Sequence, residues 1–182
     1  TSSSQHPNDF LFSINRMLAK DIHHVINSLP NTSSVGNDNI STFMLKKSSP
    51  QISKALEIIF NKSLSTSTFP ANWKSALVIP VFKKGDIYNM ANYRPISLLP
   101  VISKVFEQLI DEQLKLFMQD RNILNNAQHG FRKKKSTETD LLQLTKSLFE
   151  RKAAKLFTYV AALDFLRAFD TIDCEIMCNF LS

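Results

Sequence analysis

The segment best suited to chemistry is an apolar stretch that ends in a carboxylate. Residues 157–163 (FTYVAAL) carry no charge and lead directly into Asp164. This composition is typical of a strand buried on both faces, and a carboxylate at its end costs free energy unless it is paired or holds a cation. Because Mg²⁺ takes oxygen ligands, one interpretation of Asp164 is a carboxylate that holds metal for phosphoryl transfer.

A structural interpretation of Asp164 is also open. Residues 166–181 are expected to be helical, and Asp is a favoured residue at the N-cap of a helix. In that case Asp164 begins the helix and faces solvent. The residue pattern alone does not choose between a cap and a metal ligand.

The elements that position this segment are expected to be mainly helical. Apolar residues spaced by three and four predict amphipathic helices over 10–29, 101–118 and 137–155. Residues 40–64 are expected to form two helices separated near Pro50, because proline suits a helix start. In the helix 137–155 the side chains expected to face inward are Leu141, Leu144, Leu148 and Phe149.

One further strand is expected besides residues 157–163. Residues 75–82 (SALVIPVF) are rich in β-branched side chains, and Pro80 restricts them to an edge or bulged strand. The fold class is therefore α+β and helix-rich. Glycine is rare, and each one is expected to mark a loop conformation that other residues resist; the three are Gly36, Gly85 and Gly130.

The positive charge of the chain is concentrated in one stretch. The formal net charge is +6, and residues 121–155 contain nine Lys or Arg against three Asp or Glu. Such a local excess favours an acidic partner such as nucleic acid. A solvated basic helix face is the simpler alternative.

The two cysteines and the hydropathy indicate a location. Cys174 and Cys178 are four residues apart with no further cysteine, so they are expected to be reduced, buried side chains of an intracellular protein. No apolar run approaches the roughly 20 residues of a membrane span, and the start lacks a signal-peptide pattern. The expected location is the nucleus or cytoplasm, without membrane association.

Five sequence blocks, in order, carry a family resemblance. Residues 162–173 (ALDFLRAFDTID) resemble the first palm motif of reverse transcriptases from non-LTR retrotransposons of the jockey and CR1 kind. The earlier blocks resemble the segments that precede this motif in the same family. They are 69–74 with 79–86 (FPANWK, IPVFKKGD), 92–99 (NYRPISLL), 103–107 (SKVFE), and 128–132 with 136–138 (QHGFR, STE).

The resemblance implies a right-hand polymerase fold with a fingers region and a truncated palm. Residues 1–63 correspond to an N-terminal helical extension or the start of the fingers. Residues 64–155 correspond to the fingers, and residues 156–182 to the first part of the palm. The implied activity is RNA-directed DNA polymerisation, and the implied partners are an RNA template, a DNA primer and deoxynucleoside triphosphates, with no obvious protein partner.

The resemblance also implies roles for the palm residues. Asp164 is the first metal-binding aspartate and bridges two Mg²⁺ ions, and the backbone carbonyl of Phe165 binds the second ion. Phe169 matches the aromatic steric gate that excludes a ribose 2′-hydroxyl, although an ordinary core phenylalanine is the alternative. Asp170 and Asp173 are not assigned a metal.

Further roles fall on basic residues. Lys83 and Arg94 match the fingers residues that hold the incoming triphosphate, with Lys84 as an alternative to Lys83 and solvated loop charge as the simpler interpretation of either. Phosphates of the template or primer are expected to contact Arg132, Lys133, Lys134 and Lys135, which would bind without reading the base sequence.

The chain departs from the family pattern at two points. Asn39 stands where the family has a glycine in a turn, and Asn tolerates a left-handed backbone. The second palm motif, with its paired aspartates, does not occur in the 182 residues, so these residues are not expected to polymerise DNA by themselves. Two other functions remain open: a nucleic-acid-binding module without catalysis, and a maturase-like enzyme of group II introns.

Overall fold

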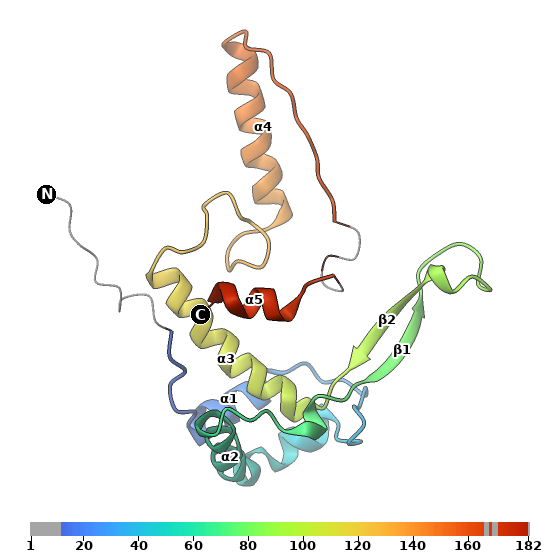
Figure 1. Cartoon of the computed structure of the whole chain (residues 1–182), viewed down its shortest axis with the longest axis vertical. Helices are drawn as coiled ribbons and strands as arrows, with labels where there is room; N and C mark the ends of the chain where they lie inside the picture. Colours follow the sequence, from blue (N-terminus) through green and yellow to red (C-terminus); the bar gives the residue numbers. More distant parts are fainter. Residues whose placement is uncertain (1–11, 166–167, 169–170, 182) are drawn as a thin grey trace, which may run out of the picture. The chain divides into compact units, whose positions relative to one another are not determined.

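The computed structural model describes residues 12–165, 168 and 171–181 (Figure 1). The chain divides into two compact units, Thr1–Leu124 and Asn125–Ser182, and each is described by itself. A compact unit reflects packing, whereas the expected boundaries after residues 63 and 155 reflect motifs. Those boundaries therefore stay predictions.

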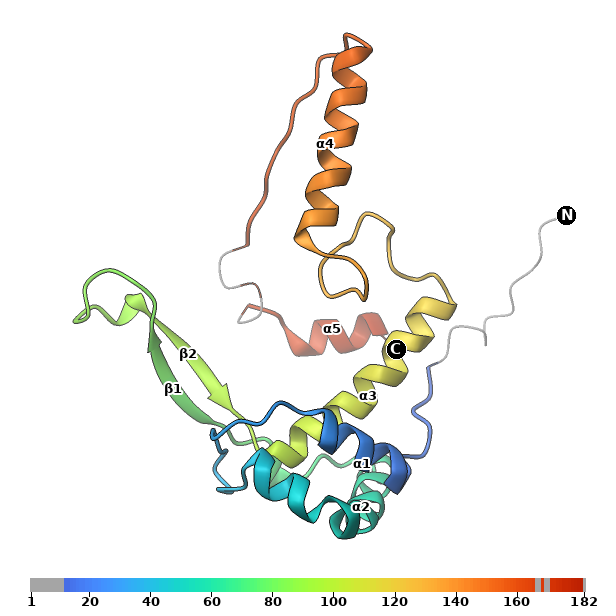
Figure 2. The same ribbon diagram turned by 180° about the vertical axis from the view of Figure 1, so that it is seen from behind.

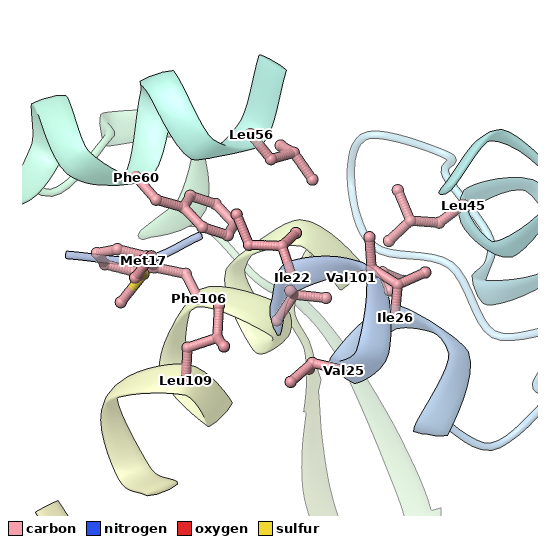
Figure 3. Close-up of a cluster of buried hydrophobic side chains, with 11 residues drawn as sticks. Met17, Ile22, Val25, Ile26, Leu45, Leu56, Phe60, Val101, Phe106 and Leu109 are labelled. Atoms are coloured by element: carbon pink, nitrogen blue, oxygen red, sulfur yellow. The ribbon is translucent and has the colours of Figure 1, made fainter. Parts of the chain in front are cut away.

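The first unit is a small helical core. It contains α1 (Ala19–Ser28), α2 (Thr42–Ser65) and α3 (Val101–Asp120), so the helix expected over 101–118 is confirmed. Figure 3 shows apolar side chains of these three helices directed toward one another. An aromatic cluster extends this core: Trp73 and Phe106 are in ring contact with each other, and each also contacts Phe60 and Phe69, at centroid distances of 4.9–5.9 Å.

The first helix is shorter than its apolar periodicity predicts. Residues 12–18 are not helical, and α1 begins at Ala19. Side chains of α2 and α3 accept the backbone N–H groups that a helix would have used internally, which satisfies them without a helix. These bonds run from Asn15 to Gln113, Met17 to Asn61 and Ala19 to Glu57, at 2.7–2.9 Å.

The expected break at Pro50 is wrong, because α2 continues through this proline. Leu45 before it and Phe60 after it are both buried in the same core. This packing outweighs the cost of an internal proline, which is about 3 kcal/mol. Ser49, next to Pro50, is fully buried, and its hydroxyl lies 2.6 Å from Nδ1 of His23 in α1.

The only sheet in the described part of the chain is a two-stranded antiparallel hairpin, visible in both views (Figure 1, Figure 2). It joins β1 (Leu77–Phe82) to β2 (Tyr93–Leu98) through a loop that contains the 3-10 turn η3 (Met90–Asn92). The edge position expected from Pro80 is confirmed, but β2 was not predicted.

The two prolines of the hairpin face each other at Pro80↔Pro95. Lys83 N–H donates to the Asn92 carbonyl at 2.8 Å, and hydrogen-bonded pairs alternate along an antiparallel ladder. The proline pair therefore falls at a non-hydrogen-bonded position, where the missing N–H groups lie on the two outer edges. Each edge lacks a donor there, which discourages pairing with a further strand.

The loop residues with special backbones are largely as expected. Asn39 has φ 56° and Gly85 has φ 94°, so asparagine does replace glycine in a left-handed turn. A Cβ on Gly36 would lie 2.8 Å from the backbone nitrogen of Pro100. Gly130 is an exception, because its φ is not positive and a Cβ there would meet nothing within 4 Å.

The second unit holds α4 (Thr137–Ala153) and α5 (Cys174–Leu181). The expected burial in α4 is wrong, since the helix has no buried residue and its four inward-assigned side chains are exposed. Cys174 and Cys178 are free thiols but exposed, not buried. None of the described helices combines the length and hydropathy that a membrane span requires.

Residues 157–163 run as a stretched trace after α4 (Figure 1) and form neither a helix nor a strand in this structure. Phe157 and Tyr159 are 94% and 96% exposed, so the expected strand buried on both faces is wrong here. A strand is defined by a hydrogen-bonded neighbour, and none of the described residues provides one for this segment. The composition is suited to a buried strand, but the strand needs a partner.

Candidate functional site

The β1–β2 hairpin brings two of the candidate cations to one face. Arg94 lies opposite Val81, and Lys83 extends the ladder through its bond to Asn92. Directly opposed residues share a face and side chains alternate with a period of two, so Lys83 and Arg94 are diagonal neighbours on the same face. Such neighbours lie about 7–8 Å apart. Both are exposed.

Lys84 is placed differently. It lies in the bend beyond the ladder, next to Gly85, and has no partner on β2. Of the two lysines, Lys83 is the one whose backbone bonds across the hairpin, through its N–H to the Asn92 carbonyl. Motif alignment alone left this choice open.

The loop beyond Lys83 is fixed by its own side chains. Asn92 Nδ2 donates to the Asp86 carbonyl at 2.8 Å, and the Tyr93 hydroxyl donates to the Ile87 carbonyl at 2.8 Å. Asp86 Oδ1 in turn accepts the N–H of Tyr88 at 3.0 Å. These bonds limit the conformations of the loop, so the end of the ladder that carries the two cations is held in shape.

Asp164 lies in the extended segment and is exposed. Phe165 is not helical, so no helix begins directly after Asp164. The N-terminus of α5 is capped by Asp173, whose Oδ1 accepts the N–H groups of Glu175 at 2.9 Å and Ile176 at 3.1 Å. The capping role that the pattern left open for Asp164 is thus filled by Asp173.

The donor set at Asp164 can be tested against Mg²⁺. A carboxylate and the carbonyl of Phe165 are hard oxygen donors of the kind that this ion takes. Within the described residues, no group of three Asp, Glu, His or Cys side chains is close enough together to hold a metal. The positions of Phe169 and Asp170 lie outside the described residues.

The remaining candidate cations lie in the basic loop, residues 125–136, which precedes α4. Arg132 Nη1 donates to the Asn125 carbonyl at 2.8 Å, and Lys135 Nζ donates to the Asn126 carbonyl. These two cations are half-buried, whereas Lys133 and Lys134 are exposed. The four consecutive basic residues therefore divide into two that bond the loop and two that face solvent.

The histidine of this loop was not assigned a role from the sequence. His129 is only 9% exposed. Its Nδ1 lies 2.7 Å from the Thr139 hydroxyl and its Nε2 lies 3.0 Å from Gln143 Oε1. Thr139 and Gln143 are four residues apart on α4, and this i, i+4 pair of polar residues was the available signal.

The first turn of α4 is itself well fixed. Ser136 and Thr139 form a reciprocal capping box, with N–H to hydroxyl distances of 2.9 and 3.3 Å. The Ser136 hydroxyl and the N–H of Glu138 hold the pKa of the Glu138 carboxyl below its usual range. His129 is therefore attached to an ordered helix start.

Comparison with known proteins adds a family match. Residues 81–181 match the family model described as Reverse transcriptase (RNA-dependent DNA polymerase). The probable RNA-directed DNA polymerase from transposon BS of Drosophila melanogaster is 34% identical over 154 residues, which are 84% of this chain and 17% of that protein.

Two further fly proteins give similar values. The RNA-directed DNA polymerase from mobile element jockey is 30% identical over 154 residues. The probable RNA-directed DNA polymerase from transposon X-element is 31% identical over 153 residues. Both matches again cover 84% of this chain and 17% of the relative, so the chain spans about one sixth of the length of these relatives.

Proposed function

Because the chain belongs to the reverse transcriptase family, in the branch carried by non-LTR retrotransposons, we propose that it supplies the fingers and the first part of the palm of an RNA-directed DNA polymerase. The proposed regions are a helical extension over residues 1–63, fingers over 64–155 and palm over 156–182. The enzyme adds deoxynucleotides to a primer 3′-hydroxyl by phosphoryl transfer on an RNA template.

The observation that carries the proposal is the shared face of Lys83 and Arg94 on the hairpin. An incoming triphosphate is strongly anionic, and catalysis of its transfer is largely a matter of positioning and charge stabilisation. Arg94 offers a forked donor and Lys83 a compact point charge. Two different cations on one exposed face suit the phosphate chain of a nucleotide.

In the palm, the proposal assigns the metal to Asp164 and the Phe165 carbonyl. Two Mg²⁺ ions, when bound, activate the primer hydroxyl and neutralise the triphosphate. Asp164 is exposed and does not cap α5, so its carboxylate is accessible to a cation. Phe169 is proposed as the steric gate on the resemblance alone.

Template and primer phosphates are proposed to meet the basic loop. Contacts to phosphates position nucleic acid without reading its sequence. The exposure of Lys133 and Lys134 supports direct contact, and Arg132 and Lys135 add positive charge close by.

A binding experiment on the 182-residue chain tests this proposal. The probe is a fluorescent RNA template annealed to a DNA primer, and anisotropy is measured at several salt concentrations. Binding should weaken steeply with salt and should fall in Lys133→Ala/Lys134→Ala. The matched control is Lys20→Ala/Lys54→Ala, which removes the same charge from exposed positions of α1 and α2. Absence of binding by the unmodified chain would contradict the proposed function.

A nucleic-acid-binding protein without catalysis is the second candidate. It is favoured by the same two exposed lysines, which need neither Asp164 nor a metal. A chimera in which this chain replaces the matching segment of the jockey polymerase separates the two functions. Mg²⁺-dependent primer extension by the chimera supports the polymerase, and template–primer binding without extension supports the second candidate.

A further inference from the structure

We propose that His129 is a positioning residue for nucleic-acid binding. It fastens the basic loop to α4 and thereby fixes Lys133 and Lys134 where phosphates can reach both. The inference rests on the proposed function, because it concerns the same basic residues. It adds a residue that touches no nucleic acid and acts through the two lysines.

Hydrogen bonds join the end of the basic loop to its start. Arg132 donates to the Asn125 carbonyl at 2.8 Å and Lys135 donates to the Asn126 carbonyl. The Asn125 side chain also accepts the N–H of Ala127 at 2.9 Å. These contacts draw the two ends of the loop together and leave Lys133 and Lys134 on the exposed outer turn between the two bonded cations.

That outer turn has an unfavourable backbone. Phe131 has φ 60° and Lys134 has φ 64°, and residues other than glycine resist this left-handed region. Such a conformation persists only where surrounding contacts over-determine it. The turn therefore needs an anchor, meaning a contact from the loop to an element outside it, to hold one arrangement.

His129 provides this anchor. It lies within the loop, it is 9% exposed, and both ring nitrogens have partners on α4, Thr139 at 2.7 Å and Gln143 at 3.0 Å. Thr139 is itself fixed by the capping box with Ser136. The ring thus connects the turn that carries the lysines to the capped N-terminal part of α4.

The test compares four forms of the 182-residue chain. They are the unmodified chain, His129→Ala, Lys133→Ala/Lys134→Ala and the combined triple variant. Each is titrated with the RNA–DNA template–primer over a range of salt concentrations, and the slope of log K against log salt counts phosphate contacts.

The lysine pair should lower the slope by about 2, one for each lost phosphate contact. His129→Ala should lower the slope in the same direction, and the triple variant should resemble the lysine pair. Such non-additivity means that His129 acts through the lysines. Fully additive losses, or a His129→Ala slope equal to that of the unmodified chain, would overturn the inference.

A folding defect must be kept apart from a positioning defect. A purely structural role would reduce the binding-competent fraction, and the salt slope of that fraction would not change. Gln143→Ala is the second variant, because it removes one partner of the ring at an exposed position of α4. It should lower the slope by less than His129→Ala, and an unchanged slope would overturn the inference.

Failure of the proposed function gives a different result. If the unmodified chain does not bind the template–primer at all, the proposed function fails, whereas additive losses in a chain that binds contradict only the role of His129.

Discussion

Lys83 and Arg94 lie on the same face of the β1–β2 hairpin, diagonally across the ladder. The Lys83 N–H donates to the Asn92 carbonyl at 2.8 Å, and Arg94 stands two residues beyond Asn92, opposite Val81. Lys84, one residue later, is outside this ladder. The ligand-binding role proposed for Lys83 and Arg94 therefore depends on a difference of one residue along the chain.

The first prediction concerns these cations. In the chimera with the jockey polymerase, Arg94→Ala and Lys83→Ala should each raise the KM for deoxynucleoside triphosphates by roughly tenfold to a hundredfold. Loss of a hydrogen bond to a charged group costs about 1.5–3 kcal/mol. The matched control is Lys84→Ala, expected to change KM less than about twofold, because exposed charges away from a site contribute little. An equal effect of Lys84→Ala would contradict the assignment.

The second prediction separates two aspartates of the palm segment. Asp164→Asn should abolish primer extension by the chimera while the affinity for template–primer stays unchanged, because the amide cannot replace a metal-binding carboxylate. Asp173→Ala removes the cap of α5 and should cost about 1 kcal/mol of stability. Its polymerase activity should fall only in step with the folded fraction. Extension at near-normal rates by Asp164→Asn would rule out the metal role.

The elements predicted correctly are those whose stability is local. The helix over 101–118 has a strong period of 3.6, and α3 (Val101–Asp120) exceeds it by two residues. Pro80 marked an edge strand because a missing N–H is a local property. The left-handed turn at Asn39 was expected because the family has a glycine there and asparagine tolerates this backbone conformation.

The failures occur where distant contacts decide. Residues 12–18 lose their helix to side chains of α2 and α3 that lie more than 35 positions away in sequence. The continuity of α2 through Pro50 depends on a core shared with α1 and α3. The segment 157–163 has the composition of a strand but no hydrogen-bonded neighbour among the described residues, and composition does not supply one.

In the candidate site, too, the sequence pointed to individual residues but not to the arrangement that depends on contacts distant in sequence. The family resemblance, together with the residue types, pointed to Lys83, Arg94, Asp164 and the four basic residues of the loop. The shared face of Lys83 and Arg94 required the register of β2, which the sequence did not predict. His129 was missed because its two partners lie ten and fourteen residues away, and only the helical geometry of α4 brings them to one ring.

The third prediction concerns the aromatic cluster. Phe106 is buried and its ring lies 4.9–5.9 Å from those of Phe60, Phe69 and Trp73. Phe106→Ala should lower the free energy of unfolding by about 3–5 kcal/mol in urea titrations. The same change at Phe149, which is 65% exposed on α4, should cost less than about 1 kcal/mol. Similar costs at both positions would contradict this description of the core.

The last prediction compares two glycines. A Cβ on Gly36 would lie 2.8 Å from the Pro100 nitrogen and 2.9 Å from the Leu99 carbonyl carbon. Both contacts are backbone atoms at the start of α3, so they cannot move aside as a side chain would. Gly36→Ala should therefore destabilise the chain by about 1–3 kcal/mol, as overpacking does.

Gly130→Ala is the matched substitution for this test. A Cβ there meets no atom within 4 Å, and the backbone φ is not in the left-handed region. This change should leave the free energy of unfolding within about 0.5 kcal/mol of the original value, or raise it slightly by restricting the unfolded chain. Both variants are unfolded in urea. Where their m-values are equal, a difference between their midpoint urea concentrations reports a difference in the free energy of unfolding. If Gly36→Ala proved as stable as Gly130→Ala, the loop at Gly36 would not pack against the start of α3 as this structure has it.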